Sequence, residues 1–198
     1  ARISGGEIYY KNENLTKNIK KAQKMIGVVA DESNLYDEMS GFDNLCFCGS
    51  LYGLTKQERG KRADELLETF QLSDVSNKMF KVYSKGMKRK LTIAAALIHN
   101  PEILFLDEPT AGIDVASVRQ IRTLIKKLNE KGATIFLTTH YIEEAERLCD
   151  RVAFINKGNI IKINTVDQLV SEAQDSNIIE VVFDSISFEK SILLKKLN

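Results

Sequence analysis

The chain has 198 residues, of which 43% are hydrophobic, and its 28 basic and 27 acidic side chains leave a formal net charge of +1. This composition is typical of a folded domain with a small appendage and excludes a disordered chain. The balanced charge provides no overall field that would favour nucleic acid as a partner. No apolar run reaches the length of about 18 residues that a transmembrane helix requires, so none is predicted.

The three cysteines, Cys46, Cys48 and Cys149, contain no C-x-x-C pair. An odd, unpatterned set of this kind indicates free thiols in a reducing cytoplasm rather than a zinc site. The start, ARISGGEIYY, has no apolar segment of the signal-peptide type. Because it runs from a glycine turn directly into a strand-like segment, we expect it to lie inside a longer protein.

Short β-type segments alternate with helical patterns along the chain, which predicts an α/β fold with a mainly parallel sheet. Two of the segments, ILFL and TIFL, are apolar without alternation, as in strands that are covered on both faces. The last two segments flank NKG and predict a hairpin at the margin of the sheet. The predicted strands are Glu7–Tyr10, Ile26–Val29, Ile103–Leu106, Thr134–Leu137, Arg151–Ile155 and Asn159–Ile163.

The interval from Gly41 to Asn100 has helical patterns throughout. One helix is expected after Thr55, which is a suitable N-cap, and another begins at Ser84 and stops at Asn100-Pro101. The interval is too long for a simple crossover connection, so an inserted helical subdomain is predicted. After Asp167, a short helix and the strand NIIEVVFD predict the start of a C-terminal extension.

The stretch ILFLDEPTAGID places Asp107 and Glu108 directly after a predicted strand. A parallel strand delivers such residues to the carboxyl edge of the sheet, where α/β proteins bind ligands. Asp107 suits Mg²⁺, which binds few carboxylates and keeps several waters. Glu108 suits a general base that polarises an attacking water. Solvated acids at a strand end are the alternative, and this motif alone does not separate the two.

Two further motifs favour a phosphate ligand. In TTHYIEEAERLCD, His140 follows the strand TIFL and reaches the same edge, where it can contact a phosphate or orient the water. In YSKGMKRKL, Ser84 and the backbone at Gly86 open a helix whose N-terminus carries about half a positive charge, which favours an anion. Taken singly, each motif is more often structural, as a satisfied histidine or a simple helix cap.

In order and spacing, these motifs resemble the ATP-binding cassette (ABC) ATPases from Gly6 to about Leu169. YSKGMKRKL resembles their signature loop, ILFLDEPT their Walker B strand, AGID their D-loop and TTH their switch-histidine segment. The resemblance implies a P-loop NTPase-like cassette whose N-terminal part is missing here, because the family's Walker A loop precedes the segment SGGEIYY. It implies an α/β ATPase core at 1–40 and 101–170, a helical signature subdomain at 41–100, and the start of a C-terminal extension at 171–198.

The resemblance also implies roles for single residues. Glu108 and His140 would be catalytic, and Asp107 would hold Mg²⁺. Asp31 stands where the family has its Q-loop glutamine and would contact ATP and Mg²⁺. The remaining residues expected to contact ATP are Ser84, Lys85, Gly86 and Asp114. Lys85 and Met87 replace a usual glycine and glutamine, and SKGMK is similar to the branch that serves ABC-2-type exporters.

The implied function is ATP hydrolysis that powers an exporter. The implied partners are a second cassette, in a nucleotide-sandwich dimer, and a membrane permease received by Asn34–Leu54. That segment could equally pack within the helical subdomain. The resemblance places the protein in the cytoplasm, on the inner face of the cell membrane.

Two other functions compete with this one. A truncated or degenerate module for dimerisation or regulation would explain the missing phosphate loop, whereas Glu108 and His140 argue against decay. A DNA-repair or ribosome-handling cassette does not fit. Only about fifty residues separate Asp31 from Tyr83, without coiled-coil heptads, and the chain holds one cassette rather than two.

Overall fold

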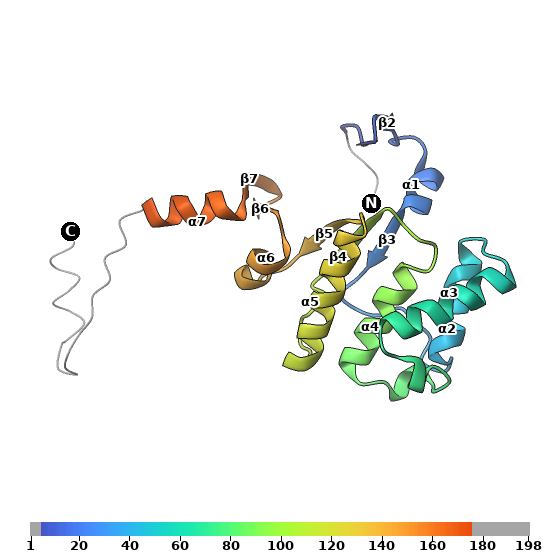
Figure 1. Ribbon diagram of the computed structural model, residues 1–198. Coiled ribbons are helices and arrows are strands. Elements are labelled where there is room, and N and C mark those ends of the chain that lie inside the picture. The colour runs from blue at the N-terminus through green and yellow to red at the C-terminus, as the bar shows by residue number, and fades with distance from the viewer. Residues whose placement is uncertain (1–4, 176–198) are drawn as a thin grey trace, which may run out of the picture. The chain divides into compact units, whose positions relative to one another are not determined.

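The computed structural model describes residues 5–175 (Figure 1). The chain divides into two compact units, Ala1–Cys149 and Asp150–Asn198, and every predicted site residue lies in the first. Within residues 5–175, no helix combines the length and the hydropathy needed to cross a bilayer.

The first unit contains a three-stranded parallel sheet in the order β3-β4-β5. Its strands are β3 (Ile26–Val29), β4 (Ile103–Asp107) and β5 (Thr134–Thr138), which match three of the predicted strands. In the register of the sheet, Leu106 of β4 pairs with Val29 of β3 and with Leu137 of β5, so that these three residues form one row. The carboxyl ends of the three strands therefore lie at one edge of the sheet.

The interval between β3 and β4 is helical, as predicted (Figure 1). Thr55 caps α3 through a capping box with Glu58, and Ser84 caps α4 by accepting a hydrogen bond from the Met87 N–H, so both predicted helix starts are confirmed. The last helix ends at Ala96, before the predicted stop at Asn100-Pro101, because the chain turns at its C-cap, Leu97. The elements are α2 (Gly41–Leu51), α3 (Lys56–Thr69), the 3-10 turns η1 (Ser73–Val75) and η2 (Phe80–Val82), and α4 (Lys85–Ala96).

Helix α5 (Val115–Glu130) follows β4, and helix α6 (Ile142–Leu148) follows β5. The buried residues Ile121 and Ile125 of α5 belong to the same hydrophobic cluster as the apolar side of α4. Close packing of α4 on the sheet depends on Gly27, because a Cβ added there would lie 2.5 Å from the Ala96 carbonyl oxygen. Helices α4 and α5 thus share one core with α2 and α3 in the first unit.

Only one face of the sheet is covered by the described residues. Leu104 and Leu106 are buried in the core formed with α4 and α5. On the opposite face, Val28, Phe105 and Phe136 form one row across the three strands and are 65%, 38% and 54% exposed. The two phenyl rings stack with centroids 4.9 Å apart. Among residues 5–175, cover is therefore present on one face, where both helices pack, and burial on both faces stays a prediction for the longer protein.

Near the start of the described chain, the predicted strand Glu7–Tyr10 is reduced to the two-residue strand β1 (Tyr9–Tyr10). It pairs antiparallel with β2 (Glu13–Asn14) rather than joining the parallel sheet. Helix α1 (Ile19–Met25) was not predicted, because its seven residues bury no side chain and show no apolar stripe. This segment positions no predicted site residue.

The second unit contains β6 (Arg151–Asn156), β7 (Asn159–Thr165) and α7 (Val166–Asp175). The strands form the predicted hairpin, and Lys157 and Gly158 both have positive φ, which matches a type I′ turn. The hairpin forms its own two-stranded sheet instead of a margin of the parallel sheet. The predicted strand NIIEVVFD lies outside the described residues, and the domain boundaries implied by the resemblance remain predictions.

Candidate functional site

The ends of β4 and β5 bring the first predicted site residues together. Asp107 is the last residue of β4 and is paired in register with Thr138, the last residue of β5. The Thr138 hydroxyl donates to Asp107 Oδ1, and the Glu108 N–H donates to the Thr138 carbonyl oxygen at 3.1 Å. The parallel pairing therefore fixes both acidic residues against the strand that leads to His140.

Glu108 and His140, the two residues predicted to be catalytic, are in direct contact. His140 Nδ1 lies 2.8 Å from Glu108 Oε1. Glu108 has a φ of 44°, a left-handed conformation that is uncommon for residues other than glycine and concentrates at functional sites. Its other carboxylate oxygen, Oε2, is buried and has no hydrogen-bond partner among residues 5–175. The carboxylate is thus held through one oxygen, which leaves the other as an unused acceptor.

Arg89 joins this group, although the sequence patterns did not select it. The side chain comes from α4 and is only 8% exposed. Its guanidinium donates to the carbonyl oxygens of Ala30 and Asp31 after β3, and to those of Asp107 and Pro109 at the end of β4. One side chain therefore connects the Asp31 segment with the Asp107 segment.

Burial lowers the pKa of Arg89, while the nearby carboxylates of Asp31 and Asp107 act in the opposite direction. The two carboxylates thus favour the charged guanidinium of Arg89, which donates hydrogen bonds to the four carbonyl oxygens. Helical periodicity could have indicated that Arg89 is buried. Arg89 lies four residues before the fully buried Ile93, so both residues lie on the same face of α4.

A second group forms where the N-termini of α4 and α5 meet. Gly86 is required there, since a Cβ at this position would lie 2.2 Å from Ser117 Oγ of α5. Gly112 has a left-handed conformation with φ of 64°, and it also lies close to α4. A Cβ added at Gly112 would lie 2.5 Å from Nζ of Lys85. Ser84 and Lys85 themselves are exposed. The segment that resembles a signature loop therefore packs against the segment that resembles a D-loop of the same chain.

Asp114 is the N-cap of α5. Its Oδ1 accepts a hydrogen bond from the Ser117 N–H at 2.9 Å, and hydrogen bonds from Ser117 lower the pKa of Asp114. This contact accounts for an acidic residue at the helix start, where the helix dipole also favours negative charge. Contact of Asp114 with a nucleotide remains a prediction, as do the predicted nucleotide contacts of Ser84, Lys85 and Gly86.

The residues at the strand ends can be tested for their fit to a divalent cation. Within residues 5–175, no group of three or more His, Cys, Asp or Glu side chains forms a metal cage. Mg²⁺ does not require such a cage, since it binds one or two carboxylates and retains waters. Asp107 lies at the sheet edge, and Arg89 holds the Asp31 backbone close to that edge. This donor set fits Mg²⁺ and offers too few protein ligands for a structural zinc site.

The architecture is that of a P-loop NTPase-like cassette, with a helical insertion before a strand that ends in adjacent acidic residues. Residues 2–111 match the sequence model of the ABC transporter family, and the chain belongs to this family.

Two curated relatives are similar over most of the chain. The linearmycin resistance ATP-binding protein LnrL of Bacillus subtilis is 41% identical over 91% of this chain and 58% of its own length. The daunorubicin resistance ATP-binding protein DrrA3 of Streptomyces coeruleorubidus is 35% identical over 100% of this chain and 62% of its own length. The chain therefore spans about three fifths of these relatives.

Two solved structures share the fold. CbiO1 of Clostridium perfringens, part of the ABC transporter complex CbiONQ, matches with a TM-score of 0.77 at 29% identity, over 87% of this chain and 70% of its own. The ATP-binding cassette MJ0796, solved as a dimer bound to ADP and Pi in a post-hydrolysis state, matches with a TM-score of 0.72 at 28% identity. That match covers 82% of this chain and 74% of the cassette.

Proposed function

We propose that the full-length protein is the ATP-binding and ATP-hydrolysing subunit of an ABC-type exporter. The observation that carries the proposal is the contact between Glu108 and His140 at 2.8 Å, beside Asp107 at the end of β4. Both curated relatives described above are resistance ATP-binding proteins, which supports export as the process that ATP drives. A degenerate, non-hydrolytic module is not favoured, because a protein that had lost hydrolysis would not need the contact between Glu108 and His140.

The geometry suggests a separate role in ATP hydrolysis for each of these residues. Asp107 would hold Mg²⁺, with Asp31 as the second candidate ligand, and the ion would neutralise charge on the phosphate oxygens. His140 contacts Glu108 Oε1, and this carboxylate would be the group that accepts a proton from the attacking water. The held carboxylate would thereby be oriented before the substrate arrives, which is how positioned groups accelerate a reaction.

The exposed N-terminus of α4 supports a second cassette as a partner. Ser84 and Lys85 are exposed at the start of α4, whose partial positive charge would favour the phosphates of a nucleotide held by the other subunit. The dimeric state of MJ0796 supports the same assembly. We propose that this protein forms a nucleotide-sandwich dimer on the cytoplasmic face of the membrane.

Replacing Ser84 with Arg should abolish the ATP-dependent dimer, because a bulky side chain would occupy the space of the phosphate. The measurement is multi-angle light scattering of the full-length protein with ATP, in a Glu108→Gln background that blocks hydrolysis. Ser84→Ala is the matched control, since it also removes the α4 cap but adds no bulk. A Ser84→Arg variant that dimerises as well as the control would contradict an intersubunit role for this loop.

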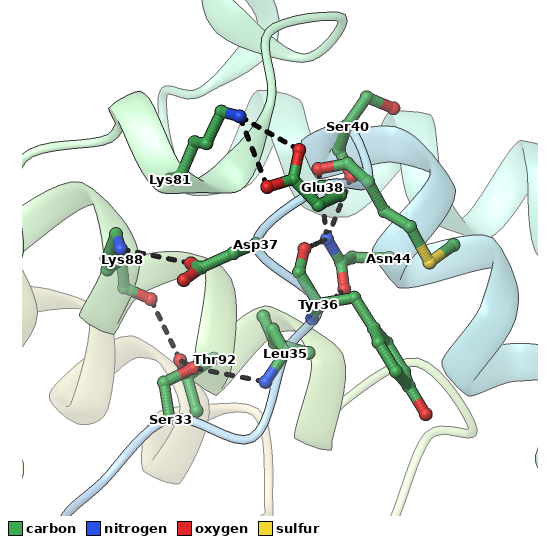
Figure 2. A network of polar contacts seen from close by, with 11 residues as sticks. Ser33, Leu35, Tyr36, Asp37, Glu38, Ser40, Asn44, Lys81, Lys88 and Thr92 are labelled. Carbon is green, nitrogen blue, oxygen red and sulfur yellow. Dashed lines mark hydrogen bonds and ion pairs between the residues drawn. The ribbon is translucent and has the colours of Figure 1, made fainter.

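The surface around residues 34–54 supports a membrane permease as the other partner. Figure 2 shows the loop before α2 held by Asn44, whose buried side chain accepts from the Tyr36 N–H and donates to the carbonyl oxygens of Tyr36 and Ser40. Beside the loop is an open cavity of about 380 Å³. Its lining mixes apolar, thiol and charged side chains: Glu38, Met39, Asp43, Cys46, Phe47, Ser50 and Arg59.

Two carboxylates on this loop remain available to a partner. Glu38 pairs with Lys81 at 2.9 Å and Asp37 with Lys88 at 3.2 Å (Figure 2), and the carboxylates are 74% and 62% exposed. Such exposed pairs contribute about 0–1 kcal/mol, so a partner cation can replace the lysine at little cost. We infer that the permease presents a short segment with apolar and basic side chains to this cavity.

Charge reversal by Glu38→Lys should therefore reduce co-purification of the permease without lowering the melting temperature by more than about 2 °C. The double variant Glu38→Lys with Lys81→Glu is the control, because it restores an ion pair inside the chain while keeping the reversed charge at position 38. Recovery of co-purification in the double variant would show that the internal ion pair matters rather than a contact with the permease.

A further inference from the structure

Helix α6 carries a glutamate that the mechanism above does not use. Glu144 is fully buried, with 0% of its surface exposed. Its Oε1 accepts a hydrogen bond from the Thr110 hydroxyl at 2.6 Å and lies 3.6 Å from Nε of Arg122. Its Oε2 is buried and has no hydrogen-bond partner in the described part of the chain. A carboxylate is costly to bury, so this placement requires the contacts with Thr110 and Arg122.

These contacts link three segments that carry predicted site residues. Thr110 follows Glu108 by two residues and is itself only 6% exposed. Helix α6 begins at Ile142, two residues after His140. Arg122 belongs to α5, the helix that Asp114 caps. Glu144 therefore connects the segment after β4 with the segment after β5, which are the two segments whose side chains meet at 2.8 Å.

The Thr110–Glu144 bond has the chemistry of a positioning contact. A hydroxyl that donates to a carboxylate makes a shorter and stronger bond than a neutral pair does, and burial removes competition from water. The side-chain contacts of Glu144 among the described residues are with Thr110 and Arg122, so it acts on Glu108 and His140 through the backbone of the segments it joins. Small displacements matter here, because a misplacement of about 1 Å at a reacting group can reduce a rate by about 10²-fold.

We propose that Glu144, through its hydrogen bond with Thr110, is a positioning residue that holds Glu108 and His140 in register for hydrolysis. The inference rests on the proposed function, since it assigns a role in the reaction of that site. It adds the buried residues Thr110 and Glu144 and the half-buried Arg122 to the residues that the reaction requires. Neither Glu144 nor Thr110 is assigned a contact with the nucleotide or the attacking water.

The test compares Thr110→Val with Thr110→Ser in the full-length protein. Valine keeps the shape but removes the donor, and serine keeps the donor. We expect Thr110→Val to lower kcat by about 10- to 100-fold with little change in the KM for ATP, and Thr110→Ser to retain most of the activity. Equal kcat in the two variants would overturn the proposal, as would a loss that follows only the fraction of folded protein.

A second variant keeps the test decisive if Thr110→Val does not fold. Glu144→Gln preserves the shape and an acceptor oxygen but removes the charge that pairs with Arg122. We expect a smaller but measurable fall in kcat, again without a change in KM. Unchanged kcat in Glu144→Gln would contradict the proposal.

Hydrogen exchange separates a failure of this inference from a failure of the proposed function. Amides in 138–142 should exchange faster in Thr110→Val than in Thr110→Ser, whether or not the protein hydrolyses ATP. If the unaltered protein has no ATPase activity, the proposed function is wrong and the exchange comparison alone decides the structural link. Identical exchange in the two variants would then reject that link.

Discussion

Glu108→Gln in the full-length protein is expected to lower ATP turnover by about 10²–10⁴-fold while ATP binding is retained. The amide is nearly isosteric with the carboxylate but is far less basic, so the side chain loses the property that would make it a base. Binding should survive because Glu108 is assigned no ligand contact other than the water. Turnover is measured as phosphate release, and binding as equilibrium binding of ATP.

The control for this prediction is Glu146→Gln, the same chemical change at an exposed position of α6 that has no assigned role. It should leave turnover within about twofold of the unaltered protein, as is usual for surface substitutions. A Glu108→Gln variant with near-normal turnover would show that another group is the base and that the His140 contact is structural.

Arg89→Met is expected to lower the free energy of unfolding by about 3–5 kcal/mol. Four carbonyl oxygens on two strand ends lose their donor together, and an unsatisfied buried acceptor costs about 1–3 kcal/mol. Water can reach part of this site after the substitution, so the total should fall below the sum of four full losses. The measurement is urea denaturation at equilibrium.

Two variants make the Arg89 result interpretable. Arg89→Lys keeps the charge but concentrates its donors on one atom, so it cannot reach both strands and should lose about half as much stability. Arg147→Met removes an exposed arginine that pairs with Glu143 at 2.8 Å and should cost no more than about 1 kcal/mol. An Arg89→Met variant as stable as Arg147→Met would mean that the four hydrogen bonds do not hold the Asp31 segment.

The features that the sequence predicted correctly are those encoded by residues close together in the chain. The apolar run before Asp107 and Glu108 identified a strand with acids at its end, because strands end where apolar patterning stops. The N-caps Thr55 and Ser84 identified two helix starts, since the capping bond joins residues three apart. The Lys157–Gly158 turn followed from the NKG segment for the same local reason.

The family motifs also predicted that His140 reaches the edge where Glu108 lies. A parallel sheet places the carboxyl ends of neighbouring strands at the same edge. The strand before Glu108 and the strand before His140 were therefore expected to form a single site. Their contact at 2.8 Å agrees with that expectation. Sequence spacing could not show, however, that only Oε1 is engaged and that Oε2 remains unpaired.

Other features depended on contacts between residues far apart in the sequence. Charged side chains are usually exposed, yet Arg89 meets carbonyl oxygens 58 and 59 residues away and Glu144 meets a hydroxyl 34 residues away. The exposed row of Val28, Phe105 and Phe136 likewise depends on which side of the sheet α4 and α5 occupy. An apolar run specifies a strand, but its two faces are distinguished only by the helices that pack on them, and that choice is made in three dimensions.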